Sequence, residues 1–255
     1  MKKIHIIIII FVLSALFNAQ QLSAQTITDL WITGTAVPGG TQKLVKFPGN
    51  KYKFAGELQK GELRVMTTET PNANTYYLNP GRVDSYVVNH GLPYSLSKVQ
   101  GNEGWVVTFD EDRYRFTVDA TAMKLTGELF QPWDELFIVG GCVSCGWEGH
   151  YFLPFTRVES ELCTWTWVGE LKERTEFVEP RRFKIMGQNA WAPKALHPFA
   201  QDENINNSTQ VCTGGDDNKW DFGKEGYYML RVDVFRETIN VTYLGTTASA
   251  AKLIK

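Results

Sequence analysis

The stretch that decides the fold spans residues 136–147 and reads Leu-Phe-Ile-Val-Gly-Gly-Cys-Val-Ser-Cys-Gly-Trp. An apolar run of strand-forming residues ends at two glycines, which permit a turn that side chains would hinder. A tight Cys-x-x-Cys loop follows, and Trp147 comes just after it. Because loops above a rigid sheet often carry binding residues, this order predicts a β-strand that presents an aromatic ring at its end. Packing of Trp147 beneath its own loop is the alternative interpretation.

A stretch of the same form lies near the start of the chain, where residues 30–34 read Leu-Trp-Ile-Thr-Gly. Further segments recur in the same order, and Gly-Glu-Leu closes one matched pair in both copies. The matched segments are 30–33 with 136–139, 52–58 with 165–171, 63–66 with 183–186, 114–119 with 228–233, and 123–127 with 237–241. Several matches in one order favour an internal duplication over coincidence.

The domain organisation follows from short strand-like runs between turn signals, without long amphipathic helical patterns after the N-terminal segment. This spacing is typical of all-β sandwiches. We predict two β-sandwich domains, at residues 27–130 and 134–245, joined by a short linker that Pro132 stiffens. Residues 67–93 are rich in turn formers and predict a long loop in the first domain. Residues 246–255 lack the strand pattern and predict a loose tail.

The N-terminus has the form of a secretory signal peptide, predicted over residues 1–24. Lys2 and Lys3 precede an apolar segment, and Leu22-Ser23-Ala24 suits cleavage. An uncleaved membrane anchor is the alternative, but the apolar core is shorter than the roughly 20 residues that a spanning helix needs. No cysteine lies near the cleavage point, so the sequence does not support a lipid anchor. We therefore expect an exported protein.

The composition limits the classes of partner. The formal net charge is −2 and no basic stripe is present, which excludes nucleic acid as a partner. Aromatic residues make up 13% of the chain and include 8 tryptophans. Such an excess requires either a tryptophan-rich core or a surface on which a ligand stacks.

All four cysteines lie in the second half of the chain: Cys142, Cys145, Cys163 and Cys212. An even count in an exported chain predicts disulfides, here clamping the loop that carries Trp147, and three pairings are open. Zinc is the rival, but no second Cys-x-x-Cys or His-x-x-x-His follows the first pair. The residues after Cys145 begin a helix poorly, which disfavours a thioredoxin-type redox role. We predict no metal site.

An ordered set of motifs in the second domain resembles a known family. The motifs are Leu-Phe-Ile-Val-Gly at 136–140, Trp-Thr-Trp-x-Gly-Glu-Leu at 165–171, Arg-Phe-Lys-Ile at 182–185, and Lys-Trp-Asp-Phe-x-x-x-Gly-Tyr-Tyr-x-Leu-x-Val-Asp at 219–233. The set is similar to the starch-binding modules of SusE and SusF, outer-membrane proteins of glycan-uptake systems in Bacteroidetes. The resemblance covers residues 136–244 well and residues 30–125 more faintly.

The resemblance implies tandem immunoglobulin-like β-sandwiches that bind starch or a similar oligosaccharide, without catalysis and without a cofactor. It implies a place at the outer membrane or cell surface, or in the periplasm. It also implies other outer-membrane glycan-uptake proteins as protein partners. The sequence does not name the glycan.

Trp147 and Trp191 are the predicted ligand-binding pair. Each follows a predicted strand and lies among turn residues, on loops that a sandwich can bring side by side. Sugar rings pack a C–H face on flat aromatic surfaces, and their hydroxyls need directed hydrogen bonds. Asn189 and Lys194 flank Trp191 and are the predicted partners of those hydroxyls. The aromatic pair matches the family pattern, and core packing of both rings is the alternative.

The remaining aromatic residues predict core positions or a spacer. Trp165 and Trp167 alternate on one predicted strand, so both should face the core. At the position that corresponds to Trp147, the first domain has Gly39-Gly40-Thr41. At the position that corresponds to Trp191, it has Asn74-Thr75-Tyr76-Tyr77. It therefore lacks the tryptophan pair, and we interpret it as a spacer; sugar stacking on its tyrosines is the alternative.

Two other classes of function compete with glycan binding. Catalysis is disfavoured because adjacent acids such as Asp110-Glu111-Asp112 diverge on turns, whereas glycoside hydrolysis needs two carboxylates about 5–10 Å apart across a cleft. The acids between residues 202 and 217 do not fit the spacing of an EF-hand calcium loop. A protein-binding role, such as that of an adhesin, is the stronger rival because fold does not fix function. Exposed rings at positions 147 and 191 would favour sugar, and buried rings would favour protein.

Overall fold

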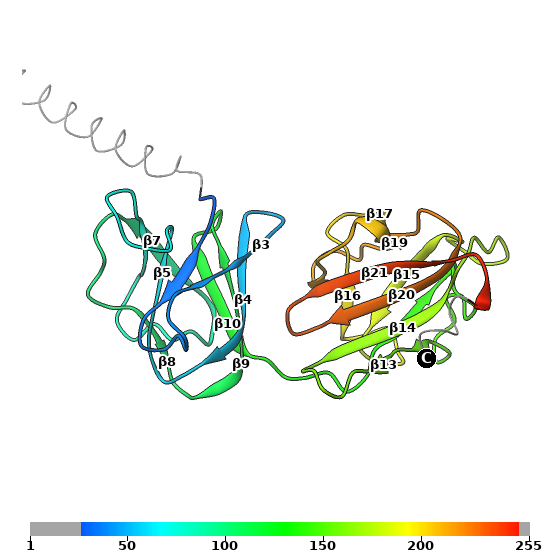
Figure 1. Ribbon diagram of the computed structural model, residues 1–255, viewed down its shortest axis with the longest axis horizontal. Coiled ribbons are helices and arrows are strands. Elements are labelled where there is room, and N and C mark those ends of the chain that lie inside the picture. Colours follow the sequence, from blue (N-terminus) through cyan, green and yellow to red (C-terminus); the bar gives the residue numbers. More distant parts are fainter. Residues whose placement is uncertain (1–26, 250–255) are drawn as a thin grey trace, which may run out of the picture. The chain divides into compact units, whose positions relative to one another are not determined.

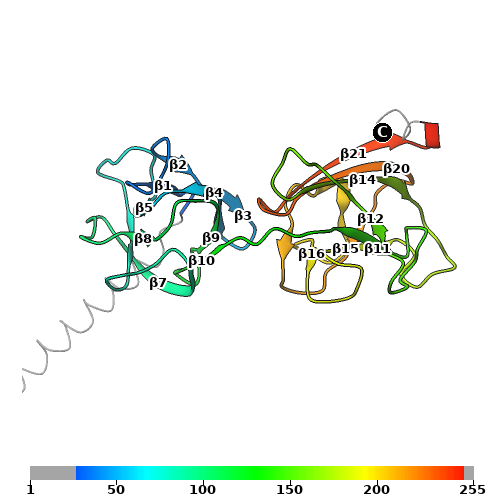
Figure 2. The same ribbon diagram turned by 90° about the horizontal axis from the view of Figure 1, so that it is seen from below.

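The computed structural model describes residues 27–249. These residues divide after Leu129 into two compact units, and each unit consists of β-strands in a sandwich-like arrangement (Figure 1; Figure 2). The predicted all-β class is therefore confirmed. The signal peptide predicted over residues 1–24 and the end of the predicted tail lie outside the described residues. Within the described range, no helix is long and apolar enough to cross a membrane.

The first unit forms one continuous sheet of antiparallel pairs in the order β2-β1-β5-β6-β7-β10-β9-β4-β3, with β8 paired to β5. Its strands are β1 Trp31–Thr33, β2 Gln42–Lys43, β3 Val45–Phe47, β4 Lys51–Leu58, β5 Gly61–Met66, β6 Tyr77–Pro80, β7 Asn89–Ser97, β8 Trp105–Val107, β9 Glu111–Asp119 and β10 Lys124–Leu129. β7 pairs with β10 along its first half and with β6 along its second half. This long strand therefore links the two layers.

The long loop predicted over residues 67–93 is interrupted by a strand. β6 lies within it, and Pro80 ends the strand opposite Tyr94 of β7. Leu78 is buried and pairs with Val65 on one side and Leu96 on the other. Burial between two neighbouring strands outweighs the turn-forming composition around it, which is the context dependence expected of β-structure.

The second unit contains two sheets. One has the order β12-β11-β15-β16-β18, with β19 paired to β15 and β17 paired in parallel to β19; the other has the order β13-β14-β20-β21. The strands are β11 Phe137–Gly140, β12 Leu153–Pro154, β13 Thr156–Arg157, β14 Thr164–Leu171, β15 Arg182–Met186, β16 Ala195–His197, β17 Glu203–Asn204, β18 Cys212–Thr213, β19 Trp220–Asp221, β20 Gly226–Asp233 and β21 Thr238–Gly245. A short 3-10 helix, Ile205–Asn207, follows β17.

The core of the second unit contains the aromatic residues that alternation predicted to face inward. Trp165 and Trp167 are both buried on β14, and Trp220 stacks on Phe183 at 5.6 Å between ring centroids. Trp133, in the segment predicted as a linker, is also buried, and its backbone N–H donates to the Cys163 Sγ at 3.2 Å. The packing of the second unit therefore begins before β11.

The shared Gly-Glu-Leu motif has a packing reason in both units. A Cβ on Gly169 would lie 2.2 Å from the Trp167 ring, and a Cβ on Gly56 would lie 3.0 Å from the Phe54 ring. Successive residues of a strand alternate between faces, so residues two apart share one face. In each unit an aromatic side chain covers the glycine two positions after it. The second unit leaves less space for a Cβ at that glycine than the first unit does.

Candidate functional site

The candidate site rests on a second, smaller core on the outer face of β11 and β15. Phe137 pairs with Met186 across these strands, and both are buried together with Val139 and Phe152. Trp147, Cys145 and Ala195 are partly buried and pack against this cluster. Ile138 faces the main core and is fully buried as well, so β11 is covered on both faces. The loop over residues 141–152 supplies the outer cover.

Glycines allow this loop to lie close to the rest of the unit. A Cβ on Gly141 would lie 2.3 Å from the Glu179 carbonyl oxygen, and a Cβ on Gly146 would lie 2.8 Å from the Phe177 ring. Gly146 also has φ of +61°, a region that favours glycine. The Gly140 N–H donates to the Gly146 carbonyl at 3.0 Å, which closes the turn. The backbone thus returns to the end of β11 and delivers Trp147 there.

Trp147 and Trp191 come together on this outer core. Their ring centroids are 6.2 Å apart and their planes are inclined by 27°. This separation lies in the range of offset aromatic pairs. Trp147 is half-buried, and its Nε1 donates to the Val178 carbonyl at 2.6 Å. Trp191 is 46% exposed, and the Phe152 ring meets it edge-on at 5.0 Å.

The indole nitrogen of Trp191 differs from that of Trp147. Among the described residues, none accepts a hydrogen bond from Trp191 Nε1, and the position next to it is occupied by a glycine. A Cβ on Gly149 would lie 3.3 Å from this nitrogen. The pair therefore combines one indole whose donor is satisfied by the protein with one whose donor is available to a ligand.

Asn189 ties the Trp191 loop to the Trp147 loop. Its Oδ1 accepts a hydrogen bond from the Phe152 N–H at 3.3 Å, and its Nδ2 donates to the His150 carbonyl at 3.2 Å. Both ends of the amide are thus engaged with backbone of the neighbouring loop. Its exposed side chain holds that loop in place, so its predicted role as a hydroxyl partner stays a prediction.

Lys194 lies at the other end of the Trp191 loop. Its N–H donates to Gln188 Oε1 and its carbonyl accepts from Gln188 Nε2, each at 2.9 Å. Its ammonium nitrogen lies over the Trp133 ring, 5.9 Å from the centroid. This cation–π contact gives Lys194 a partner within the protein, and its binding of sugar hydroxyls stays a prediction.

The disulfides predicted for Cys142, Cys145, Cys163 and Cys212 are absent from the structure, which describes all four as thiols. The Cys145 Sγ faces the Ile138 carbonyl at 3.9 Å, and the Cys212 Sγ donates to the His197 carbonyl at 3.5 Å. Cys142 is fully buried, and burial raises the pKa of its thiol. The disulfides therefore stay a prediction, and in the structure glycine packing and backbone hydrogen bonds fix the Trp147 loop.

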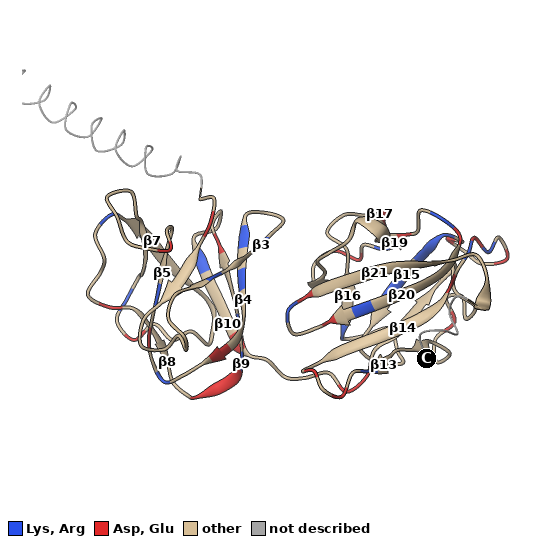
Figure 3. Ribbon diagram, viewed as in Figure 1, with Lys and Arg blue, Asp and Glu red and all other residues tan. Residues whose placement is uncertain are grey.

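A charged cluster lies on the same face of β15, next to the outer core. Lys184 is buried, pairs with Val139 of β11 and forms an ion pair with Asp217. Figure 3 colours the lysine and arginine positions blue and the aspartate and glutamate positions red. Burial raises the pKa of the Asp217 carboxyl, but the hydrogen bond from Lys184 and the lysine charge lower it more, so it lies below its usual value. The His197 Nδ1 lies 3.2 Å from the Asn218 carbonyl, and burial lowers the pKa of this histidine. These contacts fasten the β18–β19 connection to the sheet.

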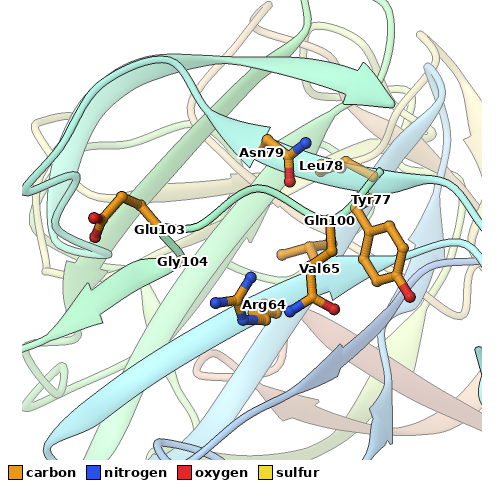
Figure 4. Close-up of a pocket in the computed structure, with 8 residues that line it drawn as sticks. All are labelled: Arg64, Val65, Tyr77, Leu78, Asn79, Gln100, Glu103 and Gly104. Atoms are coloured by element: carbon orange, nitrogen blue, oxygen red, sulfur yellow. The ribbon is translucent and has the colours of Figure 1, made fainter. Parts of the chain in front are cut away.

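The first unit has a hollow beside β5 and β6 (Figure 4). It is lined by Arg64, Val65, Tyr77, Leu78, Asn79, Gln100, Glu103 and Gly104. The Arg64 guanidinium donates to the Gly101 and Asn102 carbonyls at 2.7 and 3.3 Å, and Asn79 Nδ2 donates to the Val99 carbonyl at 3.0 Å. The chain itself supplies the hydrogen-bond partners of these polar groups. Their role is therefore to hold residues 98–104 in place.

The acidic clusters considered for catalysis or calcium are engaged in ordinary ion pairs and turns. Asp110 accepts from the Lys60 N–H at 2.7 Å, and Arg113 lies 3.6 Å from Glu111. Asp202 pairs with Arg182. Among the described residues, no group of three or more histidine, cysteine or acidic side chains could hold a metal ion.

The fold and site together define an all-β chain of two units, one of which carries a tryptophan pair on an outer core. No protein-family model matches the chain, and no curated protein does. Among solved structures, it is similar to SusF from Bacteroides thetaiotaomicron, with 12% sequence identity and a TM-score of 0.37. The match covers 86% of this chain and 50% of that one, so the chain spans about half the length of SusF.

Proposed function

We propose that this protein is a non-catalytic carbohydrate-binding protein whose second unit holds a glycan on Trp147 and Trp191. The observation that carries the proposal is the inclined ring pair, 6.2 Å between centroids, with Trp191 46% exposed. Flat aromatic faces suit the C–H faces of sugar rings. The available Trp191 Nε1 adds a donor for a hydroxyl.

Pre-organisation supports this function. Trp147 is fixed by its bond to the Val178 carbonyl, and Trp191 by the edge of Phe152. Binding to rings that are already held costs less side-chain entropy than binding to mobile ones. The small outer core thus gives a shallow site the rigidity that weak sugar contacts require.

The wider setting of the proposal is export and glycan uptake. We propose starch-type or related oligosaccharides as ligands, and a place at the outer membrane or cell surface, or in the periplasm, of a bacterium. Other outer-membrane glycan-uptake proteins are the proposed protein partners. The motifs that resemble SusE and SusF support this setting.

Binding of another protein is the second candidate function. Exposed apolar side chains occur close to the pair: Tyr151 is 71% exposed and Val178 is 78% exposed. A protein partner could cover such groups, since aromatic residues are enriched in the centres of protein interfaces. A sugar would use the ring faces and leave Val178 uncovered.

The test is a glycan array with the mature chain, followed by calorimetry on the strongest ligand. For single-site sugar binding we expect dissociation constants on the order of 10 µM to 1 mM, or about −7 to −4 kcal/mol. Absence of binding to every plant, bacterial and host glycan on the array would reject the proposal and leave the protein-binding alternative.

A further inference from the structure

Tyr151 is the most exposed aromatic side chain among the described residues. It is 71% exposed, compared with 46% for Trp191 and 46% for Tyr86 of the first unit. A single exposed aromatic ring is ordinary on a protein surface. Its exposure gains meaning because Tyr151 directly precedes Phe152, whose ring meets Trp191 edge-on at 5.0 Å.

The structure holds the backbone on both sides of Tyr151 against the loop that carries Trp191. The Asn189 amide binds the His150 carbonyl and the Phe152 N–H, which are the groups that flank Tyr151 in the chain. Phe152 in turn packs edge-on against Trp191 at 5.0 Å. The backbone that carries Tyr151 is therefore fixed through Asn189, which lies two residues before Trp191, and through Phe152, which packs against Trp191.

We infer that Tyr151 is a third aromatic contact of the glycan site, beyond the Trp147–Trp191 pair, and that the site therefore takes extended oligosaccharides. The inference rests on the proposed function, because an exposed phenol adds a subsite only if the pair holds a sugar. Sugars on the tryptophan pair fill the central subsites, and a longer chain then reaches the phenol. Short oligosaccharides occupy the pair and leave Tyr151 untouched.

Calorimetry with maltotriose and maltoheptaose, and with xylan and cellulose oligosaccharides of matched length, tests this inference. We expect Tyr151→Ala to weaken binding of the longer member by about five- to tenfold, by analogy with base stacking on aromatic residues. Binding of the shorter member should stay within about twofold. Tyr151→Phe keeps the ring and should behave like the wild type at both lengths.

Two further variants make the outcome specific. Trp191→Ala should weaken the short and the long member alike, because it removes a central contact. Tyr86→Ala in the first unit removes an equally ordinary exposed tyrosine and should change neither. Thermal melts check that all variants are folded.

The possible failures are distinguishable. If the wild type binds none of these oligosaccharides and no array glycan, the proposed function fails and the inference falls with it. If the wild type binds but Tyr151→Ala matches it at both lengths, the function stands and the third contact is rejected. An equal loss at both lengths would also overturn the inference, because Tyr151 would then belong to the central pair.

Discussion

In the first unit, β1 leaves Trp31 and Thr33 half-buried on its outer face, whereas in the second unit β11 is buried on both faces. The pairing beneath is the same. Trp31 lies opposite Met66 of β5, and Phe137 lies opposite Met186 of β15. The difference therefore lies in what covers the sheet, not in the sheet itself.

The cover comes from the connection that leaves the first strand. Between β1 and β2 this connection spans residues 34–41, and between β11 and β12 it spans residues 141–152. The longer connection supplies Trp147, Tyr151 and Phe152. The comparison teaches that similar strand pairings carry the candidate site only where a longer loop brings its own aromatic core, as expected when loops hold function and the scaffold holds position.

Other details agree between the units. The Ala120 N–H donates to the Asn50 carbonyl at 3.1 Å, and the Val234 N–H donates to the Cys163 carbonyl at 3.0 Å. Both accepting residues have positive φ, +60° and +53°, directly before β4 and β14. The tandem repeat remains a prediction, and such shared turns are expected if the two units arose by duplication.

The largest expected effect separates core tryptophans from site tryptophans. Trp165→Ala should lower the free energy of unfolding by about 3–5 kcal/mol, because a buried aromatic side chain leaves a cavity. Trp191→Ala removes a ring that is 46% exposed and should cost much less. Denaturant titrations of both variants give the comparison, and equal losses would place Trp191 in the structural core.

A smaller effect is expected where the two units share a motif. Gly169→Ala should cost about 1–3 kcal/mol, because its Cβ would lie 2.2 Å from the Trp167 ring in a packed interior. Gly56→Ala meets the Phe54 ring at 3.0 Å and should cost less. Chemical denaturation of both variants measures the loss in free energy of unfolding. A larger loss in Gly56→Ala than in Gly169→Ala would contradict this packing difference.

A change of pH tests the ion pair between Lys184 and Asp217 in the second unit. The pKa of Asp217 is lowered on folding, so its ion pair with Lys184 stabilises the second unit above the unfolded pKa and is lost as pH falls through the folded value. We expect the stability difference between wild type and Asp217→Asn to shrink below about pH 4. Thermal melts between pH 7 and pH 2 measure it, and a constant difference would exclude the ion pair as its source.

The smallest expected effect concerns coupling within the site. If Asn189 acts by holding the Tyr151 segment, Asn189→Ala and Tyr151→Ala should not be additive in maltoheptaose binding, with a coupling of about 0.5–1 kcal/mol. Calorimetry on the two single variants and the double variant gives this value. Full additivity would instead support a direct bond from Asn189 to a sugar hydroxyl.

The sequence predicted the parts of the fold that alternation encodes. Trp165 and Trp167 were assigned to the core because they lie two residues apart on one strand, and the structure confirms that both are buried. β6 was missed because Leu78 is buried only once both neighbouring strands are in place. The disulfides stay a prediction, because cysteine count and compartment do not fix where sulfur atoms lie and the structure describes four free thiols.

For the candidate site, too, only part of the arrangement could be predicted from the sequence. Trp147 and Trp191 were predicted as a pair from strand ends, turn residues and the family resemblance, and the structure brings their rings together. The positioning contacts of Asn189 and the placement of Tyr151 depend on two loops that fold against each other. The only sequence signal for that arrangement was two adjacent aromatic residues before Pro154, which does not specify a partner loop.

One comparison between the units tests the glycan site most directly: calorimetry of the best array glycan against the wild type, Trp191→Ala and Trp31→Ala. Trp31 is the matched control, since it is a half-buried tryptophan on the outer face of the first unit. We predict that Trp191→Ala weakens binding by roughly 1–3 kcal/mol, by analogy with aromatic stacking, while Trp31→Ala leaves it unchanged. Unchanged affinity in Trp191→Ala, or an equal loss in Trp31→Ala, would contradict a glycan site built on the Trp147–Trp191 pair.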